Sequence, residues 1–411
     1  MPDTSTTLAN AKAPRLLVIQ NGARHGYAIP LAFQLRGALA GVYTDLVATQ
    51  GIGPLLSRLA APQGELGSIL KRRTPPPELD GMITTFGSGF LAQRALSRVV
   101  SDRAAQRFAL RMNGLLMRLR GTGEATHIYT MFGEGGAFVE MARARGLGII
   151  GDVYIAISSD QIVYEESRRH PDWAEDVPAP TTMEQRLADN RVLLTQSDLL
   201  VCPSRFVRDD LVAHGVDIGR TIVAPYAVSP KWTSLAVEPE PGRILFAGSA
   251  ILRKGIHVLA AAAKLLEGRC SVRVAGGVSD KVRSHPQAGA LEFLGHLGPD
   301  RMAKEFARAD VFAFPSLAEG SAGVTAEALG AGLPVVTTEE SGSIVRDGIE
   351  GHIIPPRDPE RLAEAILDIV ENREKRAAMS AAARERARAF DWDGFAGSVL
   401  AALDNTLAKN N

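Results

Sequence analysis

The chain has 411 residues, and its 46 Lys and Arg balance 46 Asp and Glu. This length suffices for two or three domains with large cores, and the neutral balance argues against a general nucleic-acid binder, which carries a basic excess. Two cysteines exclude a disulfide framework and a thiolate metal cluster, and they fit a reducing, cytoplasmic location. The polar N-terminus and the lack of an apolar run of ~20 residues predict neither signal peptide nor membrane span.

Short apolar strands alternate with helical stretches along the first half of the chain. The first strand is predicted at 16–20, followed by a loop with Asn21-Gly22 and a helix over 30–41. Alternation of this kind predicts βαβ units around a parallel sheet. Further strands are predicted at 126–132, 146–156, 197–204 and 221–228.

A polar, Pro-rich stretch at 229–243 is interpreted as an interdomain linker. A second series of strands follows it, and residues 358–390 are predicted to be helical throughout. The predicted strands of this half lie at 243–248, 271–277, 291–297, 309–316, 333–338 and 351–356. The predicted fold class is α/β, with two Rossmann-like doubly wound parallel-sheet domains facing a cleft. The predicted domains are an N-terminal acceptor-side domain at 1–235, a C-terminal donor domain at 240–390, and a C-terminal helix at 391–411 that packs back on the N-terminal domain.

The stretch 309–338 is the most informative part of the sequence. After its strand comes a loop with Glu319, and a helix is expected to start near Ser321 or Ala322. Small residues let backbone approach a ligand, and a helix N-terminus favours a phosphate. Glu327 lies eight residues after Glu319, which at ~100° per residue points both carboxylates toward one side. Such carboxylates suit sugar hydroxyls, whereas a lone surface glutamate would have no such role.

A second motif follows the strand predicted at 243–248. Its short loop presents Arg253 and Lys254, and Gly255 opens a helix. Adjacent cations at the mouth of a parallel strand form a clamp suited to pyrophosphate. Two solvated surface cations are the alternative, and the position in the same domain as the two glutamates favours the clamp.

Together these motifs resemble those of retaining glycosyltransferases of family 4, which have the B-type glycosyltransferase fold of two Rossmann-like domains. The resemblance is carried by EGSAGVTAE, by the loop GSAILRKGI, and by the run from ADVFAFPS through GLPVV to VRDGIEGHIIPPRDPERLAEAI. The segment SDLLVCPSRFVRDDLVAHGVDIGRTIVAPYAV also fits, so the resemblance covers roughly half the chain.

The resemblance implies a nucleoside-diphosphate sugar as donor, held by the C-terminal domain. It implies that Glu327 holds the ribose, that Glu319 contacts the donor sugar, and that Arg253 with Lys254 neutralises the leaving diphosphate. Family members generally need no metal, so neither a metal nor a cofactor is expected. The implied catalytic residues are Arg253, Lys254 and Glu319, and the implied donor-binding residues are Gly248, Ser249, Gly320, Ser321, Ala322 and Glu327.

Two positions depart from the family pattern. Ser249 stands where many members have Arg directly after the strand glycine, and Arg253 is expected to take over that role. Tyr154 stands where many members have His, and a tyrosine hydrogen-bonds but is no base near pH 7.

The loop after the first strand is expected to line the cleft. Its residues Gly22, His25 and Gly26 are candidates for the acceptor side, together with Tyr154. A partly buried loop histidine is an equally good interpretation of His25, and a role of Glu134 at the acceptor is considered but not favoured. Five other histidines lack ligand spacing and are assigned no role: His170, His214, His257, His285 and His352.

Residues 94–120 carry seven arginines and one acid, Asp102. The arginines recur at four-residue spacing with apolar residues between them, and a basic amphipathic helix can lie on an anionic membrane. A solvated helix face is the favoured interpretation, and peripheral contact with the inner face of a membrane is kept as a hypothesis.

The sequence therefore predicts a retaining, metal-independent glycosyltransferase with a carbohydrate or lipid-linked hydroxyl acceptor and no nucleic-acid partner. Polysaccharide, glycolipid or other glycoconjugate biosynthesis in the cytoplasm would be its setting. A catalytically silent nucleotide-sugar-binding subunit is one alternative, supported by Ser249 and Tyr154, and a nucleotide-sugar epimerase of the same fold is another. A Rossmann dehydrogenase is disfavoured because no GxGxxG follows the first strand.

Overall fold

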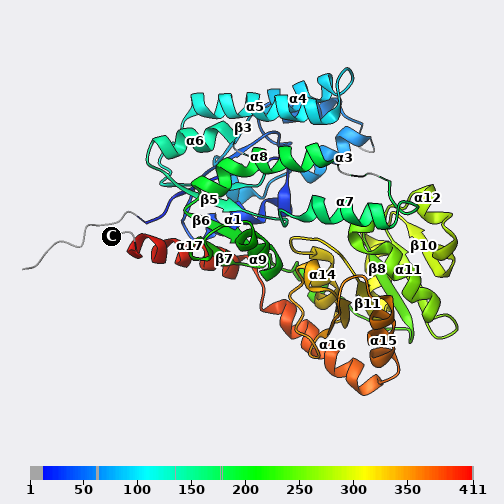
Figure 1. Cartoon of the computed structure of the whole chain (residues 1–411). Coiled ribbons are helices and arrows are strands. Elements are labelled where there is room, and N and C mark those ends of the chain that lie inside the picture. Colours follow the sequence, from blue (N-terminus) through cyan, green and yellow to red (C-terminus); the bar gives the residue numbers. More distant parts are fainter. Residues whose placement is uncertain (1–12, 62–63, 135, 176, 178, 410–411) are drawn as a thin grey trace, which may run out of the picture. The chain divides into compact units, whose positions relative to one another are not determined.

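The chain folds into two parallel β-sheets flanked by helices (Figure 1). The computed structural model describes residues 13–409 except 62–63, 135, 176 and 178. The first sheet has seven strands in the order β3-β2-β1-β4-β5-β6-β7, and the second has six in the order β10-β9-β8-β11-β12-β13. Strands pair in parallel, as β1 does with β2 and β4 and β8 does with β9 and β11. The predicted fold class, two Rossmann-like doubly wound sheets, is confirmed.

The strands coincide with the apolar runs of the sequence, and the central strands β1, β4, β8 and β11 are buried along their whole length. In the first sheet they are β1 (Leu16–Ile19), β2 (Leu39–Thr44), β3 (Ile83–Thr85), β4 (His127–Met131), β5 (Gly148–Asp152), β6 (Leu199–Cys202) and β7 (Thr221–Val223). In the second they are β8 (Arg243–Ala247), β9 (Ser271–Ala275), β10 (Leu291–Gly295), β11 (Val311–Phe314), β12 (Val335–Thr337) and β13 (Gly351–Ile353). Each strand predicted from the sequence is present, whereas β2 and β3 were not predicted.

Helices occupy most of the connections between the strands. The α-helices as far as the start of the second sheet are α1 (Ala28–Leu35), α2 (Gly53–Leu59), α3 (Glu65–Arg72), α4 (Gly87–Leu96), α5 (Asp102–Arg120), α6 (Gly136–Ala144), α7 (Ser159–Arg169), α8 (Pro180–Gln196), α9 (Arg205–Ala213) and α10 (Pro230–Thr233). Those after it are α11 (Ile256–Leu265), α12 (Asp280–Arg283), α13 (Pro299–Arg308), α14 (Gly323–Gly330), α15 (Pro359–Val370), α16 (Arg373–Arg388) and α17 (Trp392–Lys409). The short 3₁₀ helices are η1 (Arg24–Tyr27), η2 (Pro77–Leu79), η3 (Ile218–Arg220), η4 (Leu252–Lys254), η5 (Pro286–Ala290) and η6 (Glu339–Ser341).

The predicted bounds of two helices were wrong. The helix expected over 30–41 ends at Leu35, because Gly37 adopts a left-handed φ of 69° and the chain then enters β2. The helix expected over 358–390 is divided into α15 and α16, because Asn372 caps a new helix by accepting the Lys375 N–H at 2.9 Å.

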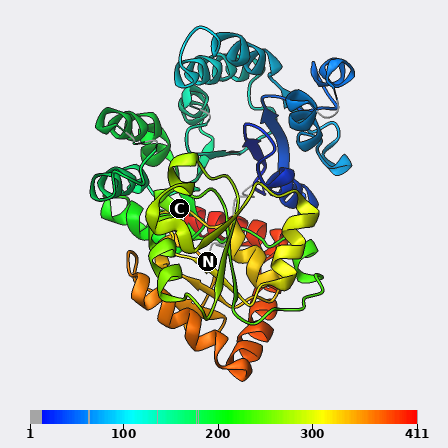
Figure 2. The same cartoon turned by 90° about the vertical axis from the view of Figure 1, so that its right-hand side faces the viewer.

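The described residues form two compact units, and each is treated by itself below. The first contains those up to Gly151 with Thr195–Asp198 and those from Leu400 on, and the second contains Asp152–Leu194 and Leu199–Val399. The second unit has a continuous apolar core in which Phe246, Phe312 and Phe314 stack. Helix α15 covers β11 and β12, and α16 (orange in Figure 2) lies beside it. Within the described part of the chain, no helix is both long and apolar enough to cross a bilayer.

Candidate functional site

The strand order of the second sheet reverses between β8 and β11. Ligands of doubly wound sheets bind beyond the carboxyl ends of the strands at such a reversal. The loop after β8 contains residues 248–255, and the loop after β11 contains residues 315–322. The predicted donor residues lie on these two loops and on α14, so the topology gathers them at the position where this fold binds ligands.

The two loops are packed backbone against backbone. Gly255 has a left-handed φ of 72°, and a Cβ there would lie 1.9 Å from the Pro315 carbonyl oxygen. The Leu317 N–H donates to the Arg253 carbonyl at 2.8 Å. At Gly248 a Cβ would lie 2.8 Å from Lys254 Nζ, so the lysine side chain crosses the end of β8 directly over this glycine.

Arg253, Lys254 and Glu319 form one ionic cluster. Arg253 Nη1 donates to the Ala318 carbonyl at 2.8 Å and lies 2.7 Å from Glu319 Oε1. The contact with Glu319 is an ion pair rather than a hydrogen bond, because Arg253 Nη1 directs its N–H at the Ala318 carbonyl. Lys254 Nζ lies 3.7 Å from the same Oε1 and 5.4 Å from the centre of the Phe314 ring. Two cations thus face one carboxylate, which leaves net positive charge for an anionic ligand.

Burial sets the electrostatics of this cluster. It lowers the pKa of Lys254, and Glu319 opposes the shift while Arg253 adds to it. Burial also raises the pKa of Glu327 on α14, against the effect of Lys231 and of the Trp232 indole. Both groups are therefore held where a bound partner of opposite charge, or a hydroxyl donor for Glu327, would restore favourable interactions.

The start of α14 differs in detail from the prediction. The helix begins at Gly323, and the Ala322 N–H, expected to face a ligand, donates instead to the Ser341 carbonyl at 2.9 Å. The Glu319 N–H donates to the Glu340 carbonyl at 2.8 Å. Ser321 is half-buried beside them, and Ser249 is exposed after β8.

Gly320 is the point where three segments meet. A Cβ on Gly320 would lie 1.6 Å from the Tyr154 carbonyl oxygen, and a Cβ on Gly342 would lie 2.2 Å from the Gly320 carbonyl oxygen. Tyr154, predicted on the acceptor side, therefore lies against the loop that carries the predicted donor residues.

A similar arrangement occurs in the first unit, where the strand order reverses between β1 and β4. The Asn21 N–H donates to Glu134 Oε2 at 2.9 Å, and Arg24 Nε donates to Glu134 Oε1 at 3.1 Å. Burial raises the pKa of Glu134 to about 7, and Arg24 opposes the shift. At both reversals an arginine after the first strand pairs with an acid after its neighbour, a parallel that the sequence analysis did not anticipate.

The predicted acceptor residues Gly22, His25 and Gly26 share the loop after β1. The Gly22 N–H donates to Asp45 Oδ1 at 2.8 Å. His25 and Tyr27, neither of which is glycine, have left-handed φ angles of 49° and 64°. Strained backbone conformations of this kind cluster at ligand sites in proteins, and they persist only where the surrounding structure holds them in place.

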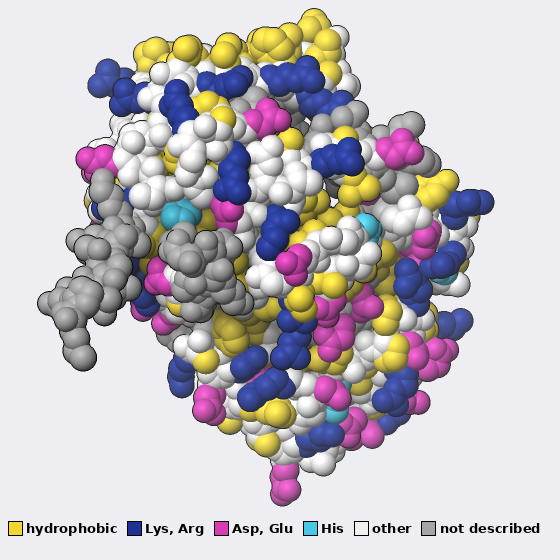
Figure 3. Space-filling view, turned by 60° about the vertical axis from the view of Figure 1, so that its left-hand side comes forward, with side chains coloured by type: hydrophobic (Ala, Val, Ile, Leu, Met, Phe, Trp, Pro, Cys, Tyr) yellow, Lys and Arg dark blue, Asp and Glu magenta, His cyan; other side chains and the backbone are white. Residues whose placement is uncertain are grey.

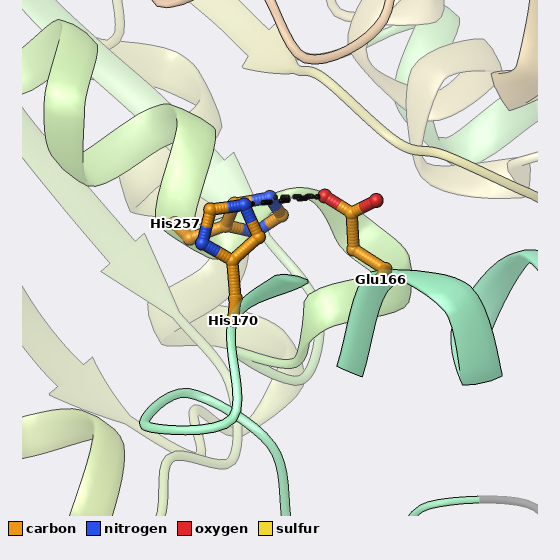
Figure 4. A group of neighbouring side chains, drawn as sticks. All are labelled: Glu166, His170 and His257. Atoms are coloured by element: carbon orange, nitrogen blue, oxygen red, sulfur yellow. Dashed lines mark hydrogen bonds and ion pairs between the residues drawn. The ribbon is translucent and has the colours of Figure 1, made fainter. Parts of the chain in front are cut away.

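One cluster was missed by the sequence analysis, which assigned no role to its histidines. Glu166, His170 and His257 each offer a ligand atom, and these atoms lie within 4.8 Å of one another (Figure 4). The sequence contains one signal of it, because Glu166 and His170 are four residues apart at the end of a helix. His257 comes from a distant part of the chain, and only the tertiary structure brings it to the pair.

Comparison with known families gives matches that centre on the second half of the chain. Residues 241–372 match the family described as glycosyl transferases group 1. D-inositol 3-phosphate glycosyltransferase of Nocardioides sp. is 31% identical over 219 residues, covering 47% of this chain and 47% of the relative. Phosphatidyl-myo-inositol mannosyltransferase of Mycolicibacterium smegmatis is 32% identical over 200 residues, covering 46% of this chain and 50% of the relative. The chain thus spans about half the length of these two relatives.

Solved structures resemble the whole chain. Sucrose-phosphate synthase from Thermosynechococcus elongatus has a TM-score of 0.63 at 17% identity, covering 97% of this chain and 100% of that one. Anabaena HepE in complex with UDP-glucose has a TM-score of 0.61 at 14% identity, covering 95% and 99%. At such low identity the likeness shows the fold alone, and this is the B-type glycosyltransferase fold. Within it, residues 241–372 carry the sequence pattern of glycosyl transferases group 1.

Proposed function

We propose that the protein is a retaining, metal-independent glycosyltransferase that moves a sugar from a nucleoside-diphosphate sugar to a hydroxyl acceptor. The observation that carries the proposal is the cluster of Arg253, Lys254 and Glu319 at the β8–β11 reversal, inside the segment that matches a glycosyltransferase family. A uridine diphosphate donor is favoured, because HepE, which shares the fold, was solved in complex with UDP-glucose.

The proposed mechanism is electrostatic. Breaking the bond between sugar and diphosphate places negative charge on the leaving phosphate, and Lys254 with Arg253 would stabilise that charge from a partly buried site. The diphosphate would compete with Glu319 for the two cations, which frees Glu319 to contact the sugar. Glu327 would accept hydrogen bonds from the ribose. Attack on the same face, assisted by the leaving phosphate, would then retain the anomeric configuration.

Two substitutions test the donor site. Lys254→Ala and Glu327→Ala are each expected to lower turnover by two or more orders of magnitude, because each removes a group that contacts the donor. Lys264→Ala, which changes an exposed lysine on α11, is the matched control and should retain full turnover. Circular dichroism and the melting temperature would show that the fold survives. Near-normal rates in both site variants would refute these assignments.

A thermal-shift screen with UDP, GDP, ADP, CMP and dTDP comes before the kinetics. A selective shift that Glu327→Ala abolishes would place the nucleotide in the second unit, since a ligand stabilises the state that binds it. Nucleotide binding without sugar transfer or donor hydrolysis would favour the silent subunit, and donor turnover without acceptor would favour the epimerase.

We also propose that the acceptor is lipid-linked and that α4 and α5 lie on an anionic membrane. Large apolar side chains are exposed along this segment, with exposed fractions of 51% for Phe108, 57% for Leu115 and 78% for Leu119. Their spacing places them on one face of α5, next to the exposed Arg111 and Arg118. Figure 3 shows hydrophobic side chains in a row along the upper edge of the molecule, with Lys and Arg below them.

A pocket adjoins this surface. It has a volume of about 530 Å³, and Leu119 and Arg120 line it together with Ile52, Phe86 and Leu116. An apolar wall with one guanidinium suits a lipid-linked acceptor whose head group is anionic or rich in hydroxyls. One similar protein, the mannosyltransferase of Mycolicibacterium smegmatis, is named for a phosphatidylinositol substrate.

Vesicle sedimentation at low and high salt tests the membrane surface. Anionic vesicles should pellet the wild type at low salt and less of it at high salt, and Leu119→Ser should weaken the binding several-fold. Ile218→Ser, which alters an exposed isoleucine of 58% exposure outside this surface, is the control. No pelleting at low salt would end the proposal.

A further inference from the structure

Helix α7 is joined to α11 by a partly buried cluster of ligand-type side chains (Figure 4). His257 Nε2 lies 2.8 Å from Glu166 Oε1, and His170 Nε2 lies 3.7 Å from the same oxygen. The two imidazole ring centres are 4.6 Å apart. The two separations from Glu166 Oε1 are thus near those between ligands of one metal ion, and all three donor atoms lie within 4.8 Å of one another.

The cluster is shielded from solvent on one side and exposed to it on the other. The Glu166 side chain is 0% exposed and that of His257 is 6% exposed, whereas 41% of the His170 side chain is exposed. An ion could therefore enter past His170 and reach two ligands that are shielded from water. Burial of the two ligands strengthens coordination, and the exposed side gives a metal ion a path into the site.

The second oxygen of Glu166 is already held in place. Arg357 Nε donates to Oε2 at 2.5 Å, and Arg169 Nη1 donates to it at 3.3 Å. Arg357 has a left-handed φ of 63°, an unfavourable conformation for a non-glycine residue. Ligating carboxylates are usually fixed by such outer hydrogen bonds, and here they leave Oε1 directed at the two histidines.

We propose that Glu166 Oε1, His170 Nε2 and His257 Nε2 bind one divalent ion of the zinc class. Imidazole and carboxylate ligands suit Zn²⁺ and Co²⁺, and three protein ligands leave a position for water. Coordination requires the ring proton of His257 on Nδ1, a buried atom without a hydrogen-bond partner among the described residues. Since a buried donor without a partner is unfavourable, the affinity should be below that of a four-ligand structural zinc site.

The ion would position the donor loop rather than take part in transfer. His257 lies on the first turn of α11, three residues after Lys254, and α7 packs against η4. An ion that joins α7 to α11 would therefore restrict the loop that carries Arg253 and Lys254. The site stands on its own geometry and does not depend on the proposed transferase activity.

Metal titration of the full-length protein tests the site. After treatment with a chelator, the protein should bind one equivalent of Co²⁺ or Zn²⁺ by calorimetry, Co²⁺ should give the visible absorption of a low-coordinate site, and the melting temperature should rise. His170→Ala should weaken binding at least tenfold. This variant changes a part-exposed side chain and should fold, whereas Glu166→Gln would also disturb Arg357.

His214→Ala is the matched control. His214 is likewise 41% exposed and lies 3.6 Å from an acid four residues earlier, Asp210, but it is not part of the three-residue cluster. Its substitution should leave one-to-one binding unchanged. The proposal is overturned if the wild type binds no ion at one equivalent, if His170→Ala binds as tightly as the wild type, or if His214→Ala loses binding to the same degree.

Discussion

Gly255 has a conformation and a location that only glycine tolerates. Its φ is left-handed, and the Pro315 carbonyl occupies the place of a side chain. The sequence shows this residue as the opening of a helix, which is correct, but it does not show the packing of the two loops against each other. The position of Lys254 next to Glu319 depends on that packing.

Gly255→Ala is therefore expected to destabilise the protein by at least roughly 2 kcal/mol and to impair nucleotide binding, because the loop must move away from Pro315. Urea unfolding measures the first effect, and the thermal shift with nucleotide measures the second. Gly277→Ala is the control, since a Cβ there has nothing within 4 Å. Equal stability of the two variants would contradict the packing described for Gly255.

The raised pKa of Glu134 predicts that the stability of the protein depends on pH. Burial raises its pKa from 4.5 to about 7, so between these values the folded protein binds a proton that the unfolded chain does not. The free energy of unfolding should therefore contain a contribution that falls as the pH rises from 4.5 to 7. Urea unfolding across this range should show a more negative slope for the wild type than for Glu134→Gln, and parallel curves would show that the carboxyl is not shifted.

At the scale of elements, α16 is anchored to the start of β11 through Asp310. Both carboxylate oxygens accept from Arg373, at 2.6 and 2.9 Å, and Arg376 Nε donates to Oδ1 at 3.1 Å. Asp310 is fully buried and also accepts the Gly242 N–H at 2.9 Å. One carboxylate thus ties together the beginning of β8, the beginning of β11 and the first turn of α16.

Asp310→Ala is expected to lower the free energy of unfolding by about 3–5 kcal/mol, because it removes the carboxylate that balances the charge of the buried Arg376. Glu364→Ala breaks the Arg361–Glu364 pair, whose side chains are 59% and 61% exposed, and should cost less than about 1 kcal/mol. Chemical denaturation of both variants provides the comparison, and a loss below 1 kcal/mol in Asp310→Ala would disprove the anchoring role.

The helical periodicity does not show the boundary between α15 and α16, although the sequence contains a residue that marks it. Alanine, glutamate and arginine continue through residues 358–390, so the helical pattern has no obvious gap. The Asn372 side chain decides the boundary by capping α16. The end of α1 was missed for a similar reason, since Gly37 is one residue among otherwise helical neighbours, and a single left-handed turn outweighs the local propensity.

On the scale of the whole chain, the proposed donor and membrane functions belong to different compact units. Hydrogen exchange with UDP should therefore protect the loops at 248–255 and 315–322 in the second unit and leave α4 and α5 unchanged. Anionic vesicles should protect α4 and α5 in the first unit. Protection by UDP confined to the first unit would contradict the proposed donor site.

The sequence by itself determined the fold class, because alternating short strands and helices are local patterns that imply parallel sheets. It also indicated Arg253, Lys254, Glu319 and Glu327, since each lies just after a strand or on the helix that follows it, near the place where this fold binds ligands. Their roles in transfer remain predictions.

The tertiary structure decided what depends on which strands and helices become neighbours. It brought Arg24 to Glu134, 110 positions away, and Arg357 to Glu166, 191 positions away. It also placed Tyr154 against Gly320 and His257 beside His170. No local periodicity encodes such pairs, because they arise only after the order of strands in the sheet and the packing of helices are fixed.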